Sequence, residues 1–167
     1  MRMPRSSLAT SLLILTGCGS YGPPADLSGV TRDQLVARMG QPATQRQIDG
    51  GTTTRLEYSR GPYGLQTWFV DLDAAGHVIR SEQVLTEKNF NQINPAMDLD
   101  EVLQRLGRPG VVQALGRSRG HVWSYRYLGP FCQWFQVEIS LEQKVRSAGY
   151  GEPPECDRPN EIIVPRG

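Results

Sequence analysis

Polar and apolar side chains alternate in two segments of this chain, at residues 67–72 and 134–139. Alternation with a period of two is typical of a β-strand that has one face in the core and the other in water. The apolar positions that share a face are Trp68, Val70 and Leu72 in the first segment and Phe135, Val137 and Ile139 in the second. Both segments are therefore predicted to be strands of a sheet with one buried face.

Two short helices are predicted upstream of these strands, because apolar side chains recur there at spacings of three and four residues. The apolar positions are Leu35, Val36 and Met39 in the first helix and Val102, Leu103 and Leu106 in the second. Thr31 and Asp98 each begin a capping box, with Gln or Glu three residues later. A glycine, Gly40 or Gly107, followed two positions later by proline predicts where each helix ends.

These features recur at a constant offset, which is 107 − 40 = 67 residues for the glycine that ends each helix. Met39-Gly40-Gln41-Pro42 is repeated as Leu106-Gly107-Arg108-Pro109. The same offset places 56–58 on 123–125 and 68–72 on 135–139 without a gap. Apolar positions fall on apolar positions throughout, so the chain is predicted to contain two tandem copies of one structural unit.

We predict an α+β fold in which these two units span 28–84 and 85–150. In each unit a short helix precedes three strands of an antiparallel sheet, and the helices pack on one face of that sheet. A further helix containing Phe90 opens the second unit, and the two units share one continuous or closely packed sheet. Residues 151–167 contain four prolines and are predicted to form an irregular tail.

The first 17 residues differ in composition from the rest of the chain. Arg2 and Arg5 precede an apolar run at 8–15, and small residues follow it. This order is typical of a secretory signal, and the run is too short to span a bilayer. The alternative is an ordinary buried helix at the amino terminus.

Leu15-Thr16-Gly17-Cys18 resembles the lipobox of bacterial lipoproteins. The resemblance implies cleavage before Cys18, which would then carry a diacylglycerol group and an N-linked acyl chain that anchor the protein in a membrane. Gly19 differs from the aspartate that retains such proteins at the inner membrane, so the outer membrane is the expected location. Residues 18–27 would be a tether between the lipid and the folded units.

Cysteine usage and charge narrow the chemistry further. Lipidation of Cys18 would leave Cys132 and Cys156 as a pair in an oxidising compartment, where a disulfide that pins the tail is expected. The alternative is two free buried thiols. Lys and Arg number 18 against 17 Asp and Glu, so no excess of positive charge predicts nucleic acid as a partner.

The second unit resembles the small outer-membrane assembly lipoproteins of the SmpA/OmlA/BamE type. The residues that carry the resemblance are Met97-Asp98-Leu99-Asp100-Glu101-Val102, Leu106-Gly107-Arg108-Pro109, Trp123-Ser124-Tyr125 and the strand around Val137. Two such units in tandem also look like the β-lactamase inhibitory proteins, whose paired modules form a saddle-shaped sheet. The resemblance covers about residues 28–150 and implies a role beside the machinery that assembles β-barrels in the outer membrane.

No catalytic or metal-binding motif emerges from the sequence. Its two histidines, His77 and His121, neighbour no candidate nucleophile and lie at no ligand spacing to either Cys132 or Cys156. The Gly- and Arg-rich stretch at 116–121 is interpreted as a solvated loop. We therefore expect a protein that is not an enzyme and that has no cofactor or metal beyond the acyl chains on Cys18.

A binding face is predicted on the polar side of the strands. Phe69 and Trp134 point away from the predicted core, and exposed aromatic rings among charges are typical of recognition surfaces. The polar residues expected around them are Arg55, Glu57, Arg126 and Gln136. The alternative is that the tail or the other unit folds over this face and buries it.

Taken together, the residues and the resemblance predict a non-catalytic, lipid-anchored module that contacts envelope proteins, the β-barrel assembly machinery among them. Two alternatives remain open at this point. One is an inhibitor-like protein that binds a periplasmic enzyme. The other is a structural lipoprotein that binds envelope lipid or peptidoglycan, for which a basic groove or a deep apolar pocket is expected.

Overall fold

The computed structural model describes residues 26–117 and 120–156. These residues form two four-stranded antiparallel sheets, each a simple meander with strand order β1-β2-β3-β4 or β5-β6-β7-β8. The first unit consists of α1 (Arg32–Met39), β1 (Thr44–Ile48), η1 (Asp49–Gly51), β2 (Thr53–Ser59), η2 (Gly61–Tyr63), β3 (Thr67–Leu72) and β4 (Val78–Gln83). The second consists of α2 (Glu87–Phe90), α3 (Leu99–Leu106), β5 (Val111–Leu115), β6 (Gly120–Arg126), β7 (Trp134–Ser140) and β8 (Val145–Gly151).

The predicted α+β class is wrong. The described chain is mostly β, with two separate four-stranded sheets and only a few short helices, so it is neither one shared sheet nor a layer of helices on a sheet. The three strands predicted for each unit omit β1 and β5. Both are edge strands with few buried side chains, and they therefore lack the alternation that marks a half-buried strand.

The 67-residue offset extends to the secondary structure. Helix α3 starts 99 − 32 = 67 residues after α1, and β5 to β8 start the same distance after β1 to β4. An isolated bridge between Thr31 and His77 in the first unit is matched by one between Asp98 and Lys144 in the second. No residue is gained or lost between the two copies across these elements.

Local interactions explain where the helices begin and end. At the start of α1, Gln34 N–H donates to Thr31 Oγ1 at 3.4 Å, and Thr31 N–H donates to Gln34 Oε1 at 3.1 Å. Both helices end at a glycine with a positive φ angle, 81° at Gly40 and 75° at Gly107. Side chains with a Cβ rarely adopt this backbone conformation, so glycine is required at both ends.

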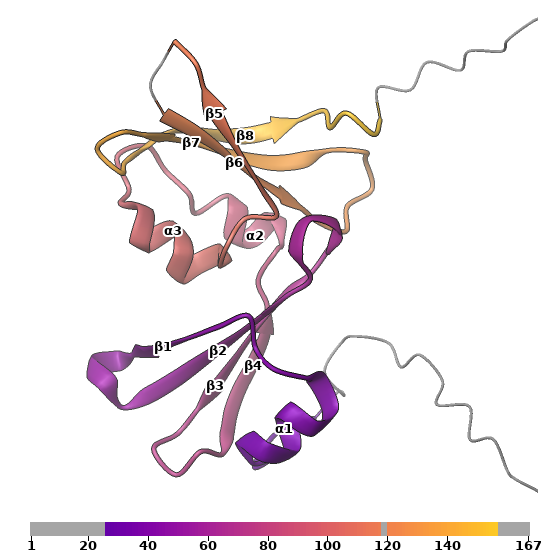
Figure 1. The fold of residues 1–167 in the computed structure, drawn as a ribbon, viewed down its shortest axis with the longest axis vertical. Helices are drawn as coiled ribbons and strands as arrows, with labels where there is room; N and C mark the ends of the chain where they lie inside the picture. Colours follow the sequence, from indigo (N-terminus) through magenta and orange to yellow (C-terminus); the bar gives the residue numbers. More distant parts are fainter. Residues whose placement is uncertain (1–25, 118–119, 157–167) are drawn as a thin grey trace, which may run out of the picture.

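Two hydrophobic clusters hold the units together, and they divide the first sheet between them. The cluster of the first unit packs Leu35 and Met39 of α1 against one face of β2 and β3. The cluster of the second unit packs α2 and α3 against β6 and β7, and it also takes in Phe69 from β3. Figure 1 shows the result: α2 and α3 lie between the two sheets, while α1 lies beyond the first sheet.

Cys18, the leader and the tail beyond residue 156 lie outside the described residues. Within the described residues, no helix has the length and apolar character needed to cross a bilayer.

Candidate interaction surface

The part of the predicted binding face that lies on the first unit is buried between the two units. Phe69 is 3% exposed and Glu57 is 1% exposed. The expectation that Phe69 is exposed is therefore wrong, and the alternative that the other unit covers it is correct. The ring of Phe69 approaches the turn at Gly107, where an added Cβ would lie 3.1 Å from Phe69 Cε1.

Glu57 is the polar centre of this contact between the units. One carboxylate oxygen accepts a hydrogen bond from the Arg108 backbone N–H at 2.9 Å. The other accepts from Thr44 Oγ1 at 3.1 Å and lies 3.4 Å from Arg46 Nη2. A buried carboxylate needs such partners, because an unpaired charge in the interior is costly. Glu57 therefore joins the units and is not available to a ligand.

Arg55 makes the second polar contact between the units. Its guanidinium donates to both carboxylate oxygens of Asp71, at 2.7 and 2.8 Å, and to the backbone carbonyl of Gln104 at 3.2 Å. The hydrogen bonds from Asp71 raise the pKa of Arg55. The guanidinium carbon also lies 4.7 Å from the centre of the Phe69 ring. Fixed in this way, Arg55 serves the interface between α3 and the first sheet.

Tyr125 completes the interface from the second unit. Its hydroxyl donates to the Gly107 carbonyl oxygen at 3.1 Å. Burial raises the pKa of Tyr125 well above its usual range, and the charge of Glu57 contributes in the same direction. The hydroxyl therefore stays neutral and holds the turn that follows α3.

Arg126 and Trp134 of the predicted face bind the start of the tail. Trp134 is buried, which corrects the expectation that it is exposed, and its Nε1 donates to Glu155 Oε1 at 3.1 Å. Arg126 Nη2 donates to the other oxygen of Glu155 at 2.6 Å. The predicted disulfide between Cys132 and Cys156 is present, with the two Cα atoms 6.0 Å apart. The tail is thus pinned over this end of the second sheet.

Gln136, the last residue of the predicted face, is half-buried. Its side-chain amide donates to Ser124 Oγ at 3.4 Å, across two neighbouring strands. The structure therefore does not bring the six predicted residues together into one exposed site. Three lie between the units, two hold the tail and one lies on the outer face of the second sheet.

Exposed apolar side chains gather instead on two loops that sequence analysis did not single out. Tyr63 is 78% exposed and Phe131 is 71% exposed, and Leu65 and Leu128 are also exposed. These four residues, which we call the loop surface, lie between β2 and β3 and between β6 and β7. The two loops lie side by side at one edge of the molecule (Figure 1), and Leu65 and Phe131 line one pocket of about 170 Å³.

Arg126 connects the two loops beneath this surface. Its guanidinium carbon lies 5.2 Å from the centre of the Tyr63 ring and 4.8 Å from that of the Trp134 ring. Cation–π contacts of this kind hold aromatic rings in place. With the disulfide at Cys132, they give both loops a fixed base. The loop surface is therefore an apolar patch on a supported frame.

The sequence does contain a signal for the loop surface. Gly61-Pro62-Tyr63 and Gly129-Pro130-Phe131 each place an aromatic residue after Gly-Pro in the corresponding loop of the two units. An aromatic ring in a turn has no strand or helix to bury it. The offset between these motifs is 129 − 61 = 68 residues, which a search at 67 passes over.

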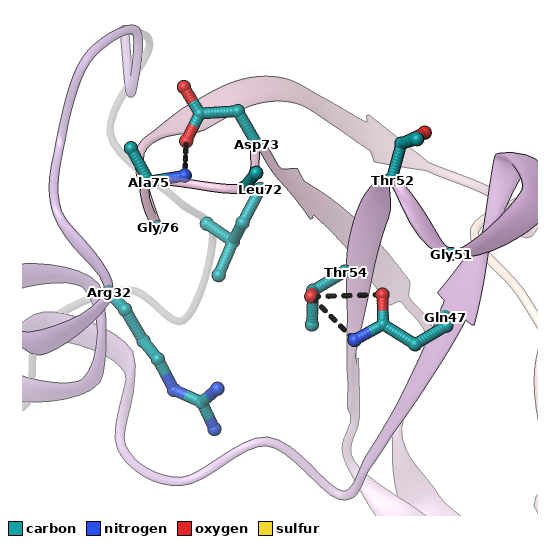
Figure 2. A pocket seen from close by; sticks show the side chains of 10 residues that line it. Arg32, Gln47, Gly51, Thr52, Thr54, Leu72, Asp73, Ala75 and Gly76 are labelled. Atoms are coloured by element: carbon teal, nitrogen blue, oxygen red, sulfur yellow. Dashed lines mark hydrogen bonds between the residues drawn. The ribbon is translucent and has the colours of Figure 1, made fainter.

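A second hollow lies at the far end of the first sheet and is polar (Figure 2). Its volume is about 420 Å³, and Arg32, Gln47, Thr54 and Asp73 are among the residues that line it. The polar groups are largely paired: Gln47 Nε2 donates to Thr54 Oγ1 at 3.0 Å, and Asp73 Oδ1 accepts from two backbone amides of its own turn. Nothing in this hollow forms a nucleophile with an adjacent base.

The described residues contain no group of three or more His, Cys, Asp or Glu side chains that could hold a metal ion.

Comparison with known proteins gives little further information. No protein-family profile and no curated protein matches the sequence. Among solved structures, an extracellular protein containing an SCP domain from Bacillus anthracis is similar at 12% identity and a TM-score of 0.33, over 82% of this chain and 48% of the other, so this chain spans about half its length. A DUF4309 family protein from Bacillus subtilis is similar at 11% identity and a TM-score of 0.29, over 74% of this chain and 78% of that one. Similarity at this level does not define the fold or the function of this chain.

Proposed function

We propose that this protein is a lipid-anchored lipoprotein of the outer membrane and that it acts, without catalysis, by binding another envelope protein. The observation that carries the proposal is the sequence Leu15-Thr16-Gly17-Cys18 behind a basic start and an apolar run. Acyl chains on Cys18 would hold the protein at the membrane, because each buried methylene contributes about 0.8 kcal/mol. The Cys132–Cys156 disulfide supports an exported location, since such bonds persist in oxidising compartments.

The loop surface is the part of the described chain that best supports protein binding. Tyr63 and Phe131 are large, exposed and backed by an arginine, which is the composition of the residues that dominate binding at protein interfaces. Their support by Arg126 and the disulfide limits the conformational entropy that binding would cost. The resemblance to assembly lipoproteins makes a component of the β-barrel assembly machinery the first candidate partner.

A periplasmic enzyme is the second candidate partner. The apolar side chains of the loop surface protrude from two adjacent loops and do not spread over a sheet face. Protruding loops fit a concave site, and enzyme clefts are concave and largely apolar. This observation favours an inhibitor-like role over a structural one.

The lipid anchor is tested by Cys18→Ser. We expect the variant to fold with its disulfide intact and to leave the membrane fraction, because the only covalent attachment point for lipid in the proposal is lost. The measurement is immunoblotting of membrane and soluble fractions after a high-salt wash, with the unchanged protein as the reference. A variant that still sediments with the membrane in high salt would show that the anchor assignment is wrong.

The loop surface is tested by photo-crosslinking in living cells that express the full chain. A photoreactive phenylalanine analogue replaces Phe131 in one strain. In the control strain it replaces Ile79, which is 57% exposed on β4 and lies outside the loop surface. We expect the Phe131 position to form a discrete crosslinked product with an envelope protein and the Ile79 position to form none. Products of equal yield at both positions, or none at Phe131, would contradict the proposal.

A further inference from the structure

We infer that the free edge of the second sheet, strand β5, binds an extended polypeptide segment as an added strand. β5 pairs with β6 on one side and is the outermost strand of its sheet on the other. Its central residues Val112, Gln113 and Ala114 are exposed, Val112 at 52%. A strand in this position presents unpaired backbone donors and acceptors, which a second strand can satisfy. This inference is independent of the loop surface.

β5 differs from the other edge strands of the described chain in carrying no charge. Charged side chains on an edge are the usual protection against pairing with another chain. The first sheet has Arg46 on β1 and Arg80 and Glu82 on β4, and the second has Arg146 on β8. β5 reads Val111-Val112-Gln113-Ala114-Leu115. It is therefore the edge that is open to strand addition.

The internal repeat makes the difference between β1 and β5 specific. Gln113 of β5 corresponds to Arg46 of β1, because 113 − 67 = 46. Arg46 lies 3.4 Å from the buried carboxylate of Glu57 and keeps a positive charge at the edge of the first sheet. The second sheet has the same backbone at this position without the charge. The two edges thus share their geometry and differ in protection.

Charges at the two ends of β5 indicate which segment would bind. Arg108 precedes the strand and Arg117 follows it, and both side chains are exposed. Their counterparts in the first unit are Gln41 and Gly50, which are uncharged. An added strand with acidic residues at both ends and uncharged β-branched residues between them would match this edge in charge and in strand preference.

The same charges argue against a second copy of this chain as the occupant. Two β5 strands paired antiparallel about Gln113 would place the arginine before one strand beside the arginine after the other. This happens at both ends of the pair, and like charges across a strand pair are destabilising. A partner with acidic ends avoids this repulsion. We therefore assign the edge to a segment of another protein.

The test uses the full-length protein in detergent and a fluorescein-labelled peptide, Glu-Glu-Val-Thr-Val-Thr-Val-Glu-Glu, with binding followed by fluorescence anisotropy. We expect saturable binding, and about tenfold weaker binding of the same peptide with Arg at its four acidic positions, since several weak charge contacts are reversed. Two further peptides carry N-methyl groups on alternate residues, on the odd or on the even positions. One set should abolish binding and the other should leave it unchanged, because only one edge of an added strand donates hydrogen bonds.

Two protein variants complete the experiment. Val112→Lys places a charge on β5, and Gln45→Lys places one at the equivalent position of β1. We expect the first to weaken peptide binding at least tenfold and the second to leave it unchanged. If Val112→Lys does not fold, the comparison of the two N-methylated peptides still decides. No saturable binding, equal effects of both methylation patterns, or a dimer in light scattering that Val112→Lys dissolves would each overturn the inference.

Discussion

Gly107→Ala is expected to destabilise the protein more than any other single methyl addition considered, and more than the same change at Gly40. Both glycines end a helix with a positive φ, so alanine at either position should cost about 1–3 kcal/mol of unfolding free energy. Around Gly40 an added Cβ meets nothing within 4 Å. At Gly107 it would lie 2.9 Å from Glu57 Oε1 and 3.1 Å from Phe69 Cε1. Overpacking at such a site costs about another 1–3 kcal/mol.

Urea denaturation of the two variants and the unchanged protein measures this difference. The Gly40→Ala variant serves as the matched control, because it shares the backbone strain and lacks the collision. The difference between the two variants then reports the contact between the units alone. Equal loss of stability in both variants would mean that Glu57 and Phe69 do not pack against the Gly107 turn in solution.

Phe90→Ala is expected to cost about 3–5 kcal/mol, the usual loss for a phenylalanine in a closed core. Phe90 is 1% exposed, and it comes from α2, which has no counterpart in the first unit. Its ring stacks on Phe135 with centroids 4.3 Å apart and meets Tyr127 edge-on at 5.0 Å. Removing it leaves a cavity that strands β6 and β7 cannot close without moving.

The matched control for Phe90→Ala is Phe131→Ala. Phe131 is 71% exposed on the loop surface, and surface substitutions usually change stability by less than about 0.5 kcal/mol. Thermal unfolding followed by circular dichroism should therefore show a large drop in midpoint for Phe90→Ala and almost none for Phe131→Ala. A comparable drop in both would indicate that the loop surface is part of the folded core.

Sequence patterns predict the parts of this fold that local interactions determine. The capping residues Thr31 and Asp98 and the glycines at 40 and 107 specify each helix through contacts within a few residues, and the structure confirms them. β1 and β5 escape the same approach. Their side chains are exposed at sheet edges, and only the partner strand, which is remote in sequence, makes them strands.

The candidate site was harder to predict because burial of its residues depends on the second unit. Glu57 and Phe69 alternate out of phase with the first core, and a charge beside a ring indicates a wet face when one sheet is considered alone. The turn after α3 covers that face and turns the charge into a buried hydrogen-bond acceptor. Nothing in the local pattern around Glu57 specifies which distant backbone will meet it.

The joint between the units does not propagate. In the second unit the positions of Glu57 and Phe69 are occupied by Ser124 and Gln136, which lack the carboxylate and the ring that grip the Gly107 turn. A neighbouring molecule that presented its own Gly40 turn to this face would find no equivalent hold. Head-to-tail stacking that reuses this contact would otherwise give an open filament. The repeat thus binds its own second half without making the protein prone to fibre growth.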